Sequence, residues 1–149
     1  MIKTGLFNSI NENLFEAIEN EDIEKIKIVL KISNKNKIKL NLNNIRDIYR
    51  NYLLLVAFNC SNVEIVKLLI EYANQHKIIL DLNKRNKNGT YALLEAGFNN
   101  NIEMVKILIE YARQHLISLE YNICEIGNKP EIIKLLKNYE KEEYYRRKV

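Results

Sequence analysis

Two histidines and two cysteines are the side chains of this sequence best suited to nucleophilic or metal chemistry. His76 and His115 are the only histidines, and Cys60 and Cys124 are the only cysteines. A nucleophile needs an activating partner, and a zinc site takes about four nitrogen, sulfur or carboxylate ligands. No histidine adjoins a cysteine in the sequence, and no further ligands gather near either histidine. We therefore expect no enzyme activity, no metal and no cofactor.

The two histidines also occupy equivalent positions of an internal repeat. The segment Asn62–Ala73 recurs 39 residues later as Asn101–Ala112, and related copies begin at Asp22 and Lys129. The segments Leu40–Asn43, Leu80–Asn83 and Leu119–Asn122 follow with nearly the same spacing. Residues that recur in this way are explained by a shared repeat pattern, which argues against a catalytic pair. Each unit therefore predicts a short helix, a longer helix, an extended segment and a polar tip.

Periodicity and capping residues support the helices. An apolar stripe with helical spacing predicts the second helix of one unit, and it consists of Val63, Val66, Leu69, Ile70 and Ala73. Ser61, Asn100 and Asn128 each precede a glutamate by three residues, which is typical of a helix N-cap. Pro130 suits a first turn, where its missing N–H costs little. The alternation of Leu80, Asp81 and Leu82 has a period of two and predicts an extended segment.

At this level the chain resembles the ankyrin repeat family. Gly89, Leu93 and Ala96 match its tip and first helix, and the second-helix core is matched by Glu103, Val105, Lys106 and Leu108. Tyr91, Ala92 and Leu94 stand where Thr, Pro and His are usual, and Arg50 replaces the tip glycine of the preceding unit. The resemblance implies an all-α solenoid of stacked helix-turn-helix repeats with extended hairpin-type loops. The extra length of the repeat lies around Ala73–Ile79. A HEAT-like solenoid is the alternative fold.

The predicted organisation is a single ankyrin-repeat domain over residues 1–149. Its units span about 13–43, 53–83 and 92–122, and a truncated capping unit covers 123–149. Cys124 aligns with Ala57 and Ala96, which predicts a small buried residue. The tail Tyr139–Val149 is expected to be a solvated helical extension.

Composition limits the function classes further. The chain has 149 residues and a net charge of +4, and no apolar run approaches the about 20 residues of a membrane span. Two cysteines without a disulfide framework favour a reducing compartment. We expect an intracellular protein, cytoplasmic rather than nuclear, without a membrane partner and with the monomer as the default state.

The resemblance implies that another protein binds to the concave face formed by the loop tips and the first helices. The candidate partner-binding residues at the tips are Arg46, Tyr49, Arg50, Lys84, Arg85 and Lys87. Those on the first helices are Asn59, Glu95, Phe98 and Asn99, with Glu16, Glu19, Asn20, Val56 and Cys60 as further positions. Arginine and tyrosine are favoured at interface hot spots.

Two other functions compete with a protein-binding module. Basic tips could contact phosphates, so nucleic-acid binding is the first alternative. Against it, the net charge is modest, and Lys35, Lys37 and Lys77 are explained by the dipole at helix ends. An enzyme with a groove site that uses His76, His115 or Cys60 is the second alternative.

Overall fold

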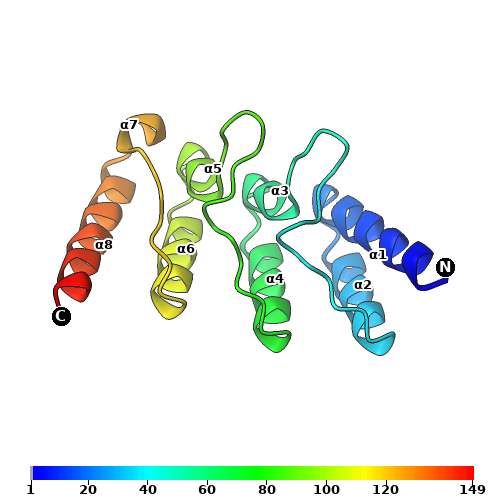
Figure 1. Ribbon diagram of the computed structural model, residues 1–149. Helices are drawn as coiled ribbons and strands as arrows, with labels where there is room; N and C mark the ends of the chain where they lie inside the picture. The colour runs from blue at the N-terminus through cyan, green and yellow to red at the C-terminus, as the bar shows by residue number, and fades with distance from the viewer. Residues whose placement is uncertain (1) are drawn as a thin grey trace.

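The structure, a computed structural model, describes residues 2–149, and this range contains eight helices and no β-strand. The helices are Ile2–Glu19 (α1), Ile23–Lys35 (α2), Leu53–Asn59 (α3), Val63–Gln75 (α4), Ala92–Phe98 (α5), Ile102–Gln114 (α6), Ile123–Ile126 (α7) and Pro130–Lys148 (α8). They form four antiparallel pairs that stand side by side in one row (Figure 1). The first helices of successive pairs contact one another, α1 with α3, α3 with α5 and α5 with α7. Among the second helices, α2 contacts α4 and α6 contacts α8. The predicted all-α solenoid is confirmed.

The second helices begin one residue later than the sequence pattern predicted. The side-chain oxygen of Asn62 accepts from the Glu64 amide at 3.1 Å, and that of Asn101 accepts from the Met104 amide at 3.0 Å. The predicted caps Ser61 and Asn100 are therefore wrong. Both have a left-handed backbone, with φ of 57° and 51°. They form the tight turn between paired helices, so the next residue becomes the cap.

The C-terminal unit departs from two expectations. Lys129, and not Asn128, precedes the first helical residue, and Pro130 occupies the first turn as predicted. Cys124 is exposed, because the single turn of α7 directs Ile126 inward instead. Ile126 fits against Gly97, where an added Cβ would lie only 2.9 Å from an Ile126 methyl carbon. The prediction of a buried Cys124 is therefore wrong.

The tail Tyr139–Val149 is helical up to Lys148 and mostly exposed, but it is also tied to the preceding unit. Tyr139 is buried, and three carboxylates of α8 bond back to the preceding unit or loop. Tyr121 donates to Glu140 at 2.7 Å, Arg113 contacts Glu142 at 2.6 Å, and the Ser118 hydroxyl donates to Glu143 at 3.5 Å. The prediction of a solvated helical extension is wrong at Tyr139, which is buried because α8 is the second helix of the last pair, and it is right for most residues beyond Tyr139, which are exposed.

A buried tyrosine of α4, α6 and α8 in each case holds the extended segment of the unit before it. The amides of Leu40, Leu80 and Leu119 donate to the hydroxyls of Tyr72, Tyr111 and Tyr139, at 3.1, 3.0 and 3.2 Å. Burial raises the pKa of Tyr111 and Tyr139 above the usual tyrosine value, so both hydroxyls stay protonated at neutral pH. We call these three tyrosines and their amide partners the tyrosine clasp.

The asparagine that ends each of the first two extended segments links it to the next segment. Asn43 donates to the Ile79 carbonyl at 2.9 Å and accepts from the Asp81 amide at 2.8 Å. Asn83 repeats this pattern with Ser118 and Glu120, at 2.8 and 2.9 Å. One side-chain amide satisfies two backbone groups in this way, which explains why asparagine recurs there. The extended segments thus fix the spacing of the pairs and of the hairpins above them.

Candidate functional site

The two hairpins that rise above the row share one hydrogen-bonding pattern. In the first hairpin the Asp47 carboxylate accepts from the amides of Tyr49 and Asn51, both at 2.8 Å. In the second, the Asn86 side chain accepts from Asn88 and Thr90, at 2.9 and 3.0 Å. The sequence analysis missed both anchors, although Asp47 and Asn86 lie one repeat apart. The tips are therefore rigid supports for side chains and not loose turns.

The missing tip glycine does not change the hairpin. Arg50 has φ 63°, close to the φ of 79° at Gly89, its equivalent in the next unit. Burial alone would raise the pKa of the Asp47 carboxyl, but hydrogen bonds from Asn51 and Tyr49 outweigh it and hold that pKa below its usual value. The carboxylate thus remains charged and keeps the first hairpin closed around a left-handed arginine.

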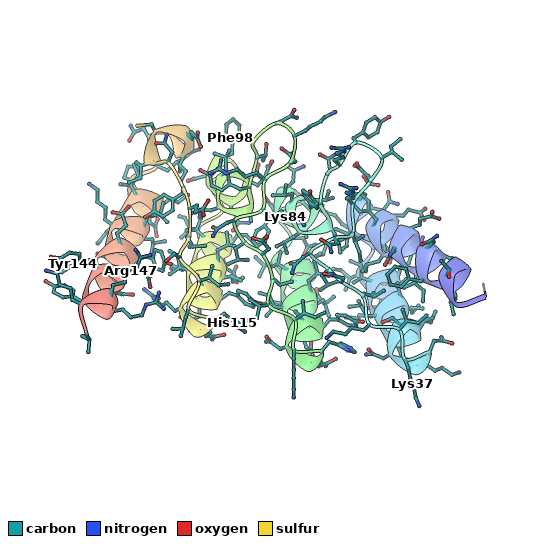
Figure 2. All side chains as sticks on the ribbon, viewed as in Figure 1. Lys37, Lys84, Phe98, His115, Tyr144 and Arg147 are labelled. Carbon is teal, nitrogen blue, oxygen red and sulfur yellow. The ribbon has the colours of Figure 1, made fainter. Side chains whose placement is uncertain are left out.

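Four of the six predicted tip residues project into solvent, namely Arg46, Tyr49, Arg50 and Lys87. The other two serve the fold. Lys84 donates to the Asn43 carbonyl at 2.8 Å and lies 4.4 Å from the Tyr52 ring centre (Figure 2). Arg85 is exposed, yet it lies 4.2 Å from the Tyr91 ring centre and donates to the Gly89 carbonyl at 3.1 Å.

The candidates on the first helices also divide into side chains that are exposed and side chains that contribute to the fold. Asn59 is exposed, and Asn99 is exposed but donates to the Asn59 carbonyl across the unit boundary at 3.3 Å. Phe98 is 73% exposed at the end of α5 (Figure 2). Glu95 is half-buried, and burial raises its pKa above the usual glutamate value. The described residues provide no cation in an ion pair with Glu95.

Two grooves lie between the hairpin tips and the first helices. The N-terminal groove, of about 390 Å³, separates α1 from the first hairpin and is lined by Glu12, Phe15, Glu16, Glu19, Ile45, Arg46 and their neighbours Asn11, Asn44, Asp47 and Ile48. The central groove, of about 380 Å³, crosses α3 between Glu19 and Glu95. It is also lined by Asn51, Leu55, Val56, Asn59, Cys60 and Asn86. Both grooves share Glu19.

The grooves bring together only part of the predicted set. Arg46 lines the N-terminal groove, while Asn59 and Glu95 line the central one. The other seven predicted residues line neither groove, namely Tyr49, Arg50, Lys84, Arg85, Lys87, Phe98 and Asn99. Sequence reasoning missed Glu12, Phe15 and Ile48 as groove residues. The signal for Glu12 was its spacing from Glu16 and Glu19, which places all three on one helix face.

A larger hollow of about 740 Å³ lies at the C-terminal end, between α8 and residues 118–121. Arg85 reaches its edge from the second hairpin. Its polar side chains bond mainly to one another, since Tyr121 donates to Glu140 at 2.7 Å and Arg147 donates to Ser118. Figure 2 shows Tyr144 and Arg147 on the last turns of α8. The wall of this hollow thus consists of internally paired groups.

The histidines and cysteines are not assembled into a reactive site. His76 and His115 each stack on the tyrosine one turn earlier, with ring centres 4.2 Å apart. Burial, followed by the nearby carboxylates of Glu21 and Glu19, raises the pKa of the Cys60 thiol and disfavours a thiolate. Within residues 2–149, no three His, Cys, Asp or Glu side chains form a group that could hold a metal ion.

The described part of the chain includes no helix with the length and hydropathy that a membrane span requires. A family model of ankyrin repeats, in three copies, matches residues 14–118. No curated protein matches the chain. The family match begins in the last turns of α1, includes α2 to α6 with both hairpins, and ends within the third extended segment.

Proposed function

We propose, because the chain belongs to the ankyrin repeat family, that it is a non-catalytic protein-binding module whose partner contacts the hairpin tips and first helices. Ankyrin repeats are generally protein–protein interaction modules and are typically non-catalytic. The finer assignment of the face rests on one observation. Two adjacent grooves run between rigid hairpins and the first helices, and exposed arginine, tyrosine and phenylalanine side chains stand around them.

The two competing functions have less support. Nucleic acid could meet the exposed Arg50 and Lys87 at the tips, but the two grooves are lined by Glu12, Glu19 and Glu95, which would repel phosphates. An enzyme site would need an activated group, whereas Cys60 is biased toward the neutral thiol.

The proposal extends to the organisation of the chain. We take residues 1–149 as one ankyrin-repeat domain that acts as a monomer in the cytoplasm and uses neither a cofactor nor a membrane. Both cysteines are free thiols, which suits a reducing compartment.

Reversal of charge at Arg50 and Lys87 tests the proposed face. Both side chains are exposed, line neither groove, and have head groups that form no hydrogen bond or ion pair within the described chain. The charge of Lys87 is the smallest of the effects that lower the pKa of Asp47, so the double variant Arg50→Glu/Lys87→Glu should still fold. We expect it to lose at least about tenfold in affinity for the authentic partner, because charged residues at an interface must match the partner's potential. The measurement is affinity capture from the source lysate, followed by titration of the captured protein.

The matched control is Lys106→Glu on the outer face of α6. It changes charge on the same fold but on the opposite helix layer, so it should retain the partner. Equal capture by both variants would show that the hairpin face is not the binding surface.

A further inference from the structure

The N-terminal groove combines an apolar floor with an acidic wall. Phe15 and Ile45 are buried at its base, and Ile48 stands at its rim with 87% of its surface exposed. The wall on the α1 side carries Glu12, Glu16 and Glu19. A side chain with an apolar stem and a charged head would satisfy both parts.

The acidic wall is largely uncompensated. Of its three glutamates only Glu16 forms an ion pair, with Lys25 at 2.9 Å, among the residues that the structure describes. Arg46 is the one basic side chain in the lining of the two grooves. The net negative potential continues along the central groove from Glu19 to Glu95, whose carboxyl is half-buried without a cationic partner in the described chain.

The position of Glu19 is unfavourable for the fold alone. It is the last residue of α1, and no basic residue lies in that final turn. Carboxylates are disfavoured at a helix C-terminus and cations are favoured there, because of the helix dipole. A cationic group from a partner would therefore be attracted by both the carboxylates and the helix end.

We propose that these grooves receive a basic segment of the partner protein, with lysine or arginine side chains along the glutamates and an aliphatic or aromatic side chain against Phe15 and Ile48. The inference rests on the proposed function and adds the chemical class of the partner. Charge complementarity selects this occupant over a nucleic acid, whose phosphates would lie against the glutamates. Apart from Arg46, the basic tip residues line neither groove, so the exposed Arg50 and Lys87 would contact other parts of the same partner.

Selection of a random dodecapeptide library on the full chain tests the proposal. We expect the enriched peptides to carry at least two basic residues beside an apolar one, and to weaken as NaCl rises from about 0.05 to 0.5 M. The variant Glu12→Lys/Glu19→Lys should bind them at least about tenfold more weakly. A second variant, Glu12→Gln/Glu19→Gln, should show a smaller loss, which separates charge from misfolding.

The matched control is Glu71→Lys/Glu110→Lys, which reverses two exposed carboxylates on α4 and α6. It should bind the selected peptides as the unmodified chain does. Enrichment of acidic or uncharged peptides, failure to enrich any, or equal binding by the groove variants would overturn the proposal. The proposal would also be overturned if Glu12 and Glu19 were needed for the chain to bind an oligonucleotide or to associate with a second copy of itself. In those cases, if the charge-reversed hairpin-tip variant still fails to capture the partner from the lysate, the proposed protein-binding function stands and only the basic segment is rejected.

Discussion

Replacement of Leu69 by alanine is expected to lower the free energy of unfolding by about 2–5 kcal/mol. Leu69 lies in the middle of α4 and is fully buried. The loss combines the transfer free energy of the deleted carbons with the cavity that they leave between packed helices. Because each helix pair of a solenoid is stabilised by its neighbours, the substitution should also destabilise the pairs on both sides of α4. Urea unfolding followed by circular dichroism measures it.

Ile79→Ala is the matched control for this substitution. It also deletes aliphatic carbons, but Ile79 is 58% exposed in an extended segment, and its change should stay within about 0.5 kcal/mol. Similar losses for the two variants would mean that no continuous core runs through the second pair.

Tyr111→Phe should destabilise the chain by about 1–3 kcal/mol through a single lost oxygen. The Leu80 amide donates to the Tyr111 hydroxyl at 3.0 Å in a buried position. Phenylalanine preserves the ring but leaves that N–H without an acceptor, and the cost is its desolvation. The urea midpoint of the variant should fall while Tyr145→Phe, at an exposed site of α8, leaves the midpoint unchanged. An unchanged urea midpoint for Tyr111→Phe would show that the tyrosine clasp does not stabilise the fold.

The sequence was sufficient for the repeat, its helices and their stacking. The predicted apolar stripe of α4 was less accurate. The prediction included Val63 and Ile70, which are half-buried, and omitted Ile65 and Tyr72, which are buried. An inner helix packs on pairs at both sides, so its buried surface is wider than the single stripe of an amphipathic surface helix. One-residue errors at Ser61 and Asn100 have a local cause, since a left-handed turn moves the cap.

The candidate site was predicted as a set of positions but not as a surface. Repeat alignment correctly identified exposed tips such as Tyr49 and Arg50. It could not tell that Lys84 is used by the fold, because its carbonyl acceptor on Asn43 lies one unit away. Nor could repeat alignment show that Glu12 and Ile48 line the same groove, since that depends on how far the hairpin stands from α1.

The measurement that tests the central claim most directly is an NMR titration of the chain with its captured partner. We expect perturbed amide resonances to gather in the two hairpins, around residues 44–51 and 84–90, and in α1, α3 and α5. The resonances of the outer faces of α2, α4 and α6 should change little. Perturbations confined to those outer faces, with the hairpins unaffected, would contradict the account.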